Sequence, residues 1–386
     1  MRTTALRRDA IAGRWRMKPD AAMTEAALAD ASLVEPARLI EHFLAHPPLG
    51  FEAQVLPGGV PAFVAPFDLL TTADDDLRRR VQRLPGHAWW RRLLRWRTCF
   101  VGTTVSEYTV LPADLDVPAF VDALLSGPAR RHALTIVKDL PQESPLLAPS
   151  HNDVARRLSE ALVARGCVML EGQALAWLPL EVADADGWLQ SLSAGRRKDL
   201  RRKLRARAEL DIRGIATGSA YFDDETVVDA YYALYDAVYA QSEIHFDRLS
   251  RAFFAAVLRD AASQGLVFEY RHGEELLGFN LCYVVNDALV DKYIGLRYPQ
   301  AREFNLYFVS WAHNLDEACR RGLRRYIAGW TDPTIKAYLG ARFTLTRHAV
   351  YLRNPLLRAL LRRIGSLFES DSQWQEDAGA TGHTRS

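Results

Sequence analysis

The chain has 386 residues, of which 49% are hydrophobic and 25% are charged, and its formal net charge is only +2. The composition is typical of a soluble globular protein, the length predicts two domains, and the small net charge argues against a DNA-binding protein. Its four cysteines lie far apart in apolar runs, a pattern that favours buried thiols in a reducing compartment over a disulfide framework or a metal site.

Residues 1–35 contain several arginines but no apolar run of the length that a signal peptide needs. No later segment approaches the roughly 20 apolar residues of a membrane span. We therefore expect a loosely ordered N-terminal arm and a cytoplasmic protein. The sequence has no CxxC, HExxH or EF-hand motif, so no metal ion is expected.

Residues 36–186 alternate between extended and helical patterns. The first extended pair is a hairpin at residues 51–67, whose turn is Pro57-Gly58-Gly59. Further extended runs and helical candidates follow at residues 100–111, 118–125, 134–137, 152–165 and 167–179. This order predicts a mixed α/β domain, in which helices cover a central sheet.

Residues 187–210 are predicted to form a basic helix that connects two domains. Leucines at helical spacing give the helix one apolar face, while its other face is strongly cationic. The cationic residues are Arg196, Arg197, Lys198, Arg201, Arg202, Lys203, Arg205 and Arg207. Two explanations fit this charge equally well. Either the helix face is simply solvated, or it forms a surface that binds the phosphates of CoA, of an RNA end or of an anionic lipid head group.

Residues 221–258 are predicted to form two aromatic-rich helices joined by a polar loop. The side chains in this loop that can exchange hydrogen bonds with a ligand are Gln241, Glu243, His245 and Asp247. Surface loops carry recognition residues more often than the elements they connect. We therefore expect acceptor recognition here, with Gln241 and Asp247 as substrate-binding residues.

Residues 265–352 follow the order strand, strand, strand, long helix, strand, short helix, strand. The corresponding segments are 266–270, 276–285, 288–296, 303–321, 323–328, 333–339 and 343–352. Gly322 ends the long helix, and Pro333 opens the short one. The first two strands form a hairpin through a turn at Gly273.

Residues 354–386 are predicted to form an amphipathic helix and a disordered polar tail. The helix, over residues 355–368, places leucines on one stripe and arginines on the other side. Docked helices and helices that lie on a membrane surface share this pattern. Because the helix follows the last strand with little linker, we expect it to dock, and contact with a membrane surface remains the alternative.

Three stretches carry a resemblance to a known family: residues 289–296, residues 318–323, and Gly329 followed by Lys336. Together with the order of the elements, they resemble the GNAT superfamily of N-acyltransferases, and more narrowly its two-domain BioF2-like and FemAB-like members. The resemblance implies an α/β fold of tandem GNAT-like units, each a mixed central sheet flanked by helices.

The same resemblance implies that residues 36–186 form a degraded unit and residues 211–353 the acyltransferase unit. It implies an enzyme that transfers an acyl group from acetyl-CoA or another acyl-CoA, its co-substrate, to an amine acceptor. Transfer would occur by direct attack in a ternary complex. The acceptor would be a small molecule or a component of cell-envelope biosynthesis.

The acceptor amine arrives as an ammonium ion, so a group must remove a proton before the nitrogen attacks. Asp291 lies inside an apolar strand, where a carboxylate is costly unless it is paired or has a task. Alternation places Asp291 on the same face as Tyr293, a candidate substrate contact. Glu243 and His245 are comparable candidates for the base, and Tyr326 is a candidate for protonating the leaving group. Simple pairing explains a buried aspartate equally well.

The donor is expected beside strand 288–296, with its phosphates at the start of the long helix. The candidates for binding the donor are Arg297, Arg302, Asn305 and Lys336. The alternative for Lys336 is that its side chain is solvated and binds nothing. The glycine-rich pyrophosphate loop of the family is missing here, because residues 297–305 contain no glycine. This departure keeps two alternatives open: FemAB-like transfer from aminoacyl-tRNA to a cell-wall precursor, and a non-catalytic binding protein.

Overall fold

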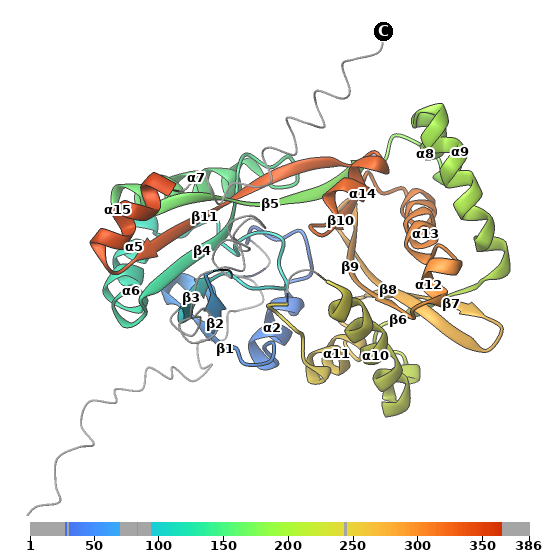
Figure 1. Cartoon of the computed structure of the whole chain (residues 1–386), viewed down its shortest axis with the longest axis horizontal. Helices are drawn as coiled ribbons and strands as arrows, with labels where there is room; N and C mark the ends of the chain where they lie inside the picture. The colour runs from blue at the N-terminus through green and yellow to red at the C-terminus, as the bar shows by residue number, and fades with distance from the viewer. Residues whose placement is uncertain (1–27, 29–30, 70–82, 84–93, 243–244, 365–386) are drawn as a thin grey trace, which may run out of the picture.

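The computed structural model of the chain describes residues 28, 31–69, 83, 94–242 and 245–364 (Figure 1). Most of the expected N-terminal arm, the polar tail and Glu243 lie outside these residues. Within the described part, no helix combines the length and apolar character needed to cross a membrane.

One mixed sheet of 11 strands runs through the described part of the molecule, in the order β1-β2-β3-β4-β11-β5-β10-β9-β8-β7-β6. The strands are β1 (Glu52–Val55), β2 (Pro61–Asp68), β3 (Arg95–Val101), β4 (Leu134–Pro141), β5 (Val168–Pro179), β6 (Asp211–Ala216), β7 (Leu266–His272), β8 (Glu275–Val285), β9 (Ala288–Leu296), β10 (Arg325–Gly329) and β11 (Arg342–Leu352). Two neighbouring pairs are parallel, β3 with β4 and β9 with β10, and the others are antiparallel.

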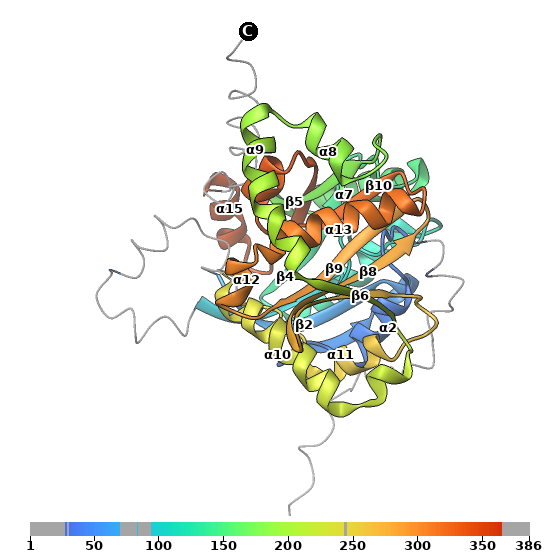
Figure 2. The same cartoon turned by 90° about the vertical axis from the view of Figure 1, so that its right-hand side faces the viewer.

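Helices flank this sheet, so the predicted mixed α/β fold is confirmed. They are α2 (Arg38–Ala45), α5 (Val117–Ser126), α6 (Pro128–Arg131), α7 (Pro149–Ala164), α8 (Ala185–Ser191), α9 (Ala194–Lys203), α10 (Glu225–Gln241), α11 (Arg251–Leu258), α12 (Gln300–Glu303), α13 (Leu306–Arg320), α14 (Pro333–Tyr338) and α15 (Pro355–Ile364). In the C-terminal half, α8, α9 and α13 pack on one face of the sheet, and α10 and α11 pack on the other (Figure 2).

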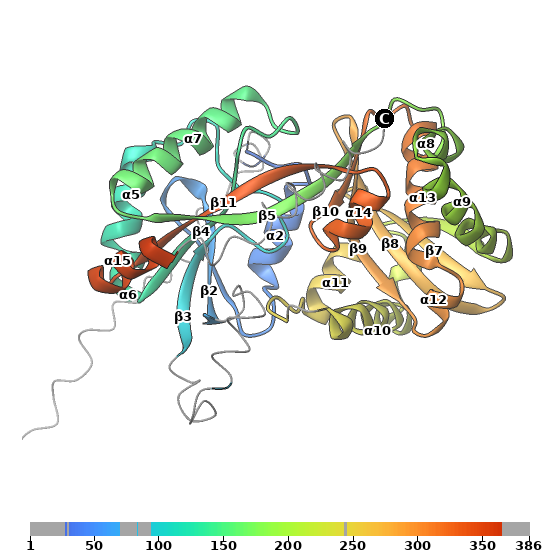
Figure 3. The ribbon, with the colours of Figure 1, turned by 45° about the horizontal axis from the view of Figure 1, so that its top comes forward.

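Each half repeats one pattern, an antiparallel run that leads into a parallel pair. The two halves nevertheless share a continuous sheet, because they exchange their longest strands (Figure 3). The end of β5, Ala176–Pro179, pairs with β10, and β11 of the C-terminal half lies between β4 and β5. At 12 and 11 residues, β5 and β11 span roughly 36 to 40 Å, long enough to serve both halves. This differs from the expected separate sheet for each unit, and residue 186 marks no break in the sheet.

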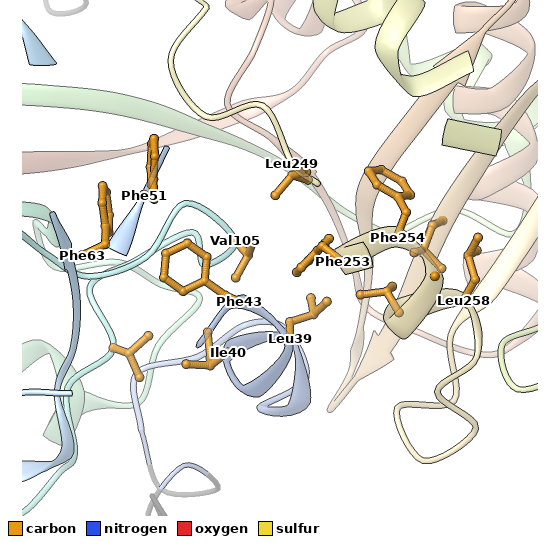
Figure 4. Close-up of a cluster of buried hydrophobic side chains, with 14 of the residues drawn as sticks. Leu39, Ile40, Phe43, Phe51, Phe63, Val105, Leu249, Phe253, Phe254 and Leu258 are labelled. Carbon is orange, nitrogen blue, oxygen red and sulfur yellow. The ribbon is translucent and has the colours of Figure 1, made fainter. Parts of the chain in front are cut away.

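A shared hydrophobic core also joins the halves. Figure 4 shows Leu39 of α2 beside Phe253 of α11, and both side chains are buried in one cluster with Phe43 and Leu258. At the edge of this cluster, Asp260 accepts hydrogen bonds from Arg38 at 2.8 and 3.0 Å and lies 2.9 Å from a ring nitrogen of His42. Apolar burial and these charges therefore fix the relative position of the two halves.

A truncated chain of residues 187–386 should fail to fold on its own, because it lacks β5 and leaves the edges of β10 and β11 unpaired. We expect aggregation and no cooperative thermal transition by circular dichroism. Co-expression with residues 1–186 should restore a soluble complex that melts in one transition. A monomeric, cooperatively melting 187–386 fragment would contradict the strand exchange.

The basic connection consists of two α-helices and a short 3-10 helix, Leu204–Glu209, instead of the single helix expected at residues 187–210. The side chain of Asp184 caps α8 by accepting from the N–H of Gly187 at 2.8 Å, and the extended backbone at Leu192 and Ser193 separates α8 from α9. Both helices pack on α13 through a cluster that includes Leu189 and Leu200. The cationic face of α9 therefore belongs to the C-terminal half.

The last helix, α15, docks through its arginines, in contrast to the expected docking of its leucine stripe. The Arg358 guanidinium lies 4.3 Å from the centroid of the Tyr351 ring, and Arg362 donates to the carbonyl of Gly166 at 3.2 Å. Leu356 is 79% exposed and Leu360 is 52% exposed. The short link after β11 fixes which side of the helix meets the sheet. Of the described leucines in the stripe, Leu361 packs against the core cluster, and Leu356, Leu357 and Leu360 are exposed.

Candidate active site

The strands β9 and β10 separate part of the way along their length. Their parallel pairing ends where Val290 meets Ile327, because the chain turns away at Gly329, whose φ is 76°, and enters α14. β9 continues to Leu296 with no strand beside it on this edge in the described structure. The side chain of Lys292 is only 7% exposed, yet the residue as a whole is partly exposed. Part of the exposed area of Lys292 is therefore backbone. The edge of β9 therefore offers free backbone groups.

A β-bulge lies at the same point of β9. Cys282 of β8 is opposite Asp291, but the preceding residue, Leu281, is opposite Tyr293, so Lys292 is the extra residue. The bulge overturns the prediction that Asp291 and Tyr293 share a face. Asp291 points toward α13, whereas the Tyr293 ring packs against Phe253 on the opposite face at a centroid distance of 5.9 Å.

The carboxylate of Asp291 is surrounded by donors. It accepts hydrogen bonds from Asn280 at 3.0 Å, from Asn314 at 3.1 Å and from the Tyr326 hydroxyl at 2.9 Å, and the Cys282 thiol lies at 3.8 Å. The residue as a whole is partly exposed through the open strand edge, but these donors enclose its side chain. Burial raises the pKa of Asp291, and the hydrogen bonds partly offset that rise.

Tyr326 and Lys336 complete this cluster from β10 and α14. Tyr326 is fully buried, and burial together with the charge of Asp291 raises the pKa of its hydroxyl well above the usual range. Lys336 is 2% exposed, so the alternative of a solvated lysine is wrong. Burial lowers the pKa of Lys336 to about 8, although the charges of Asp291 and Glu107 oppose this shift. Its ammonium group forms no ion pair within the described chain.

The segment that would hold a donor's pyrophosphate is already hydrogen-bonded internally. The N–H groups of Ala301, Arg302, Phe304 and Asn305 donate to nearby carbonyls at 2.7 to 3.2 Å. Arg297 donates to the carbonyl of Leu276 at 2.9 Å, and Arg302 donates to Gln241 at 2.8 Å. Asn305, with a φ of 51°, precedes α13 without capping it through its side chain. Arg297 and Arg302, which were predicted to bind the phosphates, are therefore already hydrogen-bonded within the protein, and so are the four backbone N–H groups.

The residues of the loop predicted to recognise the acceptor do not come together at one site. Gln241 holds Arg302, and the exposed His245 packs against Tyr239 at 5.1 Å, away from Asp291. Asp247 instead lies partly exposed between the halves, where burial raises the pKa of its carboxyl and the charge of Lys138 opposes that rise. Of the predicted catalytic residues that the structure describes, Asp291 and Tyr326 are brought together and His245 is not, and Lys336, predicted to bind the donor, joins the first two.

Sequence reasoning missed Asn280, Asn314 and the residues from the N-terminal half. Asn314 lies on the buried face of α13, so a polar residue in an apolar stripe is the signal that could have revealed it. Glu107 forms an ion pair with Lys292 although the two are 185 residues apart in the chain. Nothing in local sequence indicates such a pair.

Part of the chain matches a known family model. Residues 194–337 match the model of the acetyltransferase (GNAT) domain. A search of curated proteins finds no match. Among solved structures, the C-terminal domain of a putative lysylphosphatidylglycerol synthetase from Agrobacterium fabrum is 13% identical, with a TM-score of 0.52 over 89% of this chain and 94% of that one.

Two further solved structures are similar to the chain. FemX is 11% identical, with a TM-score of 0.45 over 84% of this chain and 98% of that one. A tandem GNAT protein from the clavulanic acid biosynthesis pathway is 15% identical, with a TM-score of 0.42 over 86% and 93%. At such low identities, structural likeness is informative about the fold alone.

Proposed function

We propose that this protein transfers an acyl group to an amine acceptor by direct attack in a ternary complex. The match of residues 194–337 to the acetyltransferase (GNAT) domain model supports this proposal. The acyl donor lies along the open edge of β9, where free backbone groups can pair with it. The amine nitrogen forms a bond to the acyl carbon, and the bond from that carbon to the leaving oxygen or sulfur breaks. No covalent enzyme intermediate is needed.

Lys336 acts on the reacting carbonyl in this proposal. Its ammonium group has no carboxylate partner in ion-pair distance among the described residues, so it is free to stabilise the developing oxyanion and to give a proton to the leaving group. Asp291 accepts hydrogen bonds at both oxygens, so it serves as a positioning residue for Tyr326 and as a counter-charge near Lys336, not as the base. The proton of the amine therefore needs another acceptor.

For the donor, we favour aminoacyl-tRNA over acyl-CoA. The observation that carries this choice is the internal bonding of residues 301–305, which leaves four N–H groups of this loop unavailable to a pyrophosphate. The cationic surface of α9 and the turn after it adds support, because Arg201 and Arg205 are exposed and have no ion-pair partner among the described residues. With Arg207, which pairs with Asp316, they line a hollow of about 360 Å³ beside α13 whose other charged residues are Asp184 and Asp186. RNA phosphates suit the two unpaired arginines. Acyl-CoA remains the second candidate because the open edge of β9 also suits pantetheine.

The acceptor proposed here is an amine of a small molecule or of a cell-envelope component. The fold similarity to the lysylphosphatidylglycerol synthetase domain is consistent with a role at the cell envelope. The support comes from the shared fold, since the two chains are 13% identical.

Isothermal titration with aminoacyl-tRNA, uncharged tRNA and acetyl-CoA tests the donor. We expect submicromolar binding of the charged tRNA that weakens with salt, and much weaker binding of acetyl-CoA. The double variant Arg201→Ala/Arg205→Ala should weaken tRNA binding and reduce its salt dependence, whereas Arg156→Ala on the distant helix α7 should change neither. Tight binding of acetyl-CoA alone would select the second candidate, and binding of neither donor would favour a non-catalytic protein.

A further inference from the structure

The exposed apolar side chains of the described chain gather at one end of the molecule. Seven large hydrophobic residues of the described part are exposed, and three of them, Leu356, Leu357 and Leu360, lie on α15. A fourth, Val163, lies in the last turn of α7, three residues before Gly166, which contacts α15. Figures 1 and 3 show α15 at the far end of the N-terminal half, beside α6. Single surface leucines are ordinary, but several on one helix indicate a surface that meets an apolar partner.

Two arginines hold α15 so that these leucines face outward. Arg358 covers the Tyr351 ring, and Arg362 donates to the carbonyl of Gly166. Gly166 has a φ of 91°, and a side chain at this position would begin 3.2 Å from a guanidinium nitrogen of Arg358 and 3.6 Å from one of Arg362. Glycine adopts this backbone conformation without strain and leaves room for both guanidinium groups. The outward orientation of the leucines is therefore built into the contacts of α15.

The surface around the exposed leucines is strongly cationic. It consists of residues 127–133, which include α6, and residues 353–364, which include α15; these two segments contain no carboxylate. Arg353 joins them, because it donates to the carbonyl of Arg130 at 2.9 Å. None of the arginines in the two segments forms an ion pair within the described part of the chain. These arginines are Arg130, Arg131, Arg353, Arg358, Arg362 and Arg363.

Charge and apolar side chains occupy the same side of α15. Arg363 comes three residues after Leu360 and seven after Leu356, a spacing that places all three on one side of a helix. All three residues are exposed. A partner of this face therefore has to accept leucine side chains and balance positive charge at the same time.

We propose that this end of the molecule binds the surface of an anionic lipid bilayer, with α15 lying in the plane of the interface. The exposed leucines enter the boundary between head groups and acyl chains, and the arginines meet the lipid phosphates. A bilayer accepts protruding leucines without a groove of matching shape. A second copy of the chain is a poorer partner, because pairing two such surfaces brings arginines against arginines. Membrane binding of this kind is separate from the proposed acyl transfer, since it needs neither donor nor acceptor.

Flotation of the full-length protein with lipid vesicles tests this proposal. The vesicles contain phosphatidylcholine with about 30% phosphatidylglycerol, and pure phosphatidylcholine is the neutral control. The wild-type protein should float with the anionic vesicles at low salt and much less with the neutral vesicles. High salt should release part of the bound protein, because it screens the arginines.

Two variants separate the apolar contribution from the electrostatic one. Leu356→Ser/Leu360→Ser should weaken binding to anionic vesicles by at least about tenfold, because two side chains no longer leave water. Arg363→Gln should weaken the same binding by about fivefold and leave binding to neutral vesicles unchanged. The matched control Leu49→Ser, which replaces an exposed leucine before β1, should float like the wild type. All of these variants should melt at the wild-type temperature, because the replaced side chains are exposed.

Three outcomes would overturn the proposal: no flotation of the wild type with anionic vesicles, equal flotation of Leu356→Ser/Leu360→Ser, or a clearly lower melting temperature of this double variant. The last result would mean that the leucines are buried against the protein. A wild-type dimer in light scattering that the double variant dissociates would also overturn it, because a second copy would then cover the leucines. Transfer to a water-soluble amine is measured without vesicles, so the proposed function is tested independently.

Discussion

Replacing Lys336 with methionine should lower kcat by about 10²- to 10⁴-fold, the usual contribution of a positioned proton-transfer group. Methionine fills much of the space of the lysine stem, so the change removes the ammonium group and little else. The variant should not melt at a lower temperature, because the lowered pKa of Lys336 means that the buried charge opposes folding. Steady-state kinetics with saturating donor and thermal melting measure the two effects. A lower melting temperature with an unchanged kcat would assign Lys336 a structural role.

The pH dependence follows from the same group. Because the pKa of Lys336 is lowered from 10.5 to about 8, the group is an ammonium ion at neutral pH, and the rate should fall as the pH rises through about 8. Stability should change in the opposite direction. Between pH 8 and 10.5 the unfolded chain holds this proton and the folded chain does not, so the wild type gains stability relative to Lys336→Met. The rate profile and the melting profile therefore check one assignment independently.

Replacing Asp291 with asparagine should lower kcat by about 10- to 100-fold without destabilising the fold. The new amide oxygen can accept from Tyr326 and Asn314, and its NH₂ group can donate to Oδ1 of Asn280, which has no partner in the described structure. Burial raises the pKa of Asp291, so removing its charge also removes a cost to folding. The loss of activity would then reflect the missing charge.

The variant has a second, more specific consequence. The negative charge of Asp291 raises the pKa of Lys336, so its removal should lower that pKa and move the alkaline fall in rate to lower pH. The pH profile of kcat/KM measures this shift. Asp287→Asn, in the turn before β9, where Asp287 pairs with Arg324 at the surface, is the matched control and should leave the profile unchanged. If the pH profile of Asp291→Asn does not move, the charge of Asp291 does not influence the group that controls the alkaline fall in rate.

The sequence determined the elements of the C-terminal half and three members of the site, Asp291, Tyr326 and Lys336. Strands and helices from residue 265 onward follow from local periodicity, because the spacing of apolar side chains depends on the backbone geometry of each element. Asp291 was recognisable as a lone charge in an apolar strand, which is a local feature that can be found without knowing what packs against it. Lys336 was singled out because its spacing from Gly329 resembles that of the GNAT superfamily.

Only the tertiary structure decided how these parts meet. The exchange of β5 and β11 depends on backbone hydrogen bonds between distant strands, which leave no mark on side-chain periodicity. The bulge at Lys292 reversed the face of Tyr293, because one extra residue shifts all later side chains to the other side of the sheet. The partners of Asp291 and the carboxylate that pairs with Lys292 come from elements far apart in the chain, and long-range packing alone brings them together.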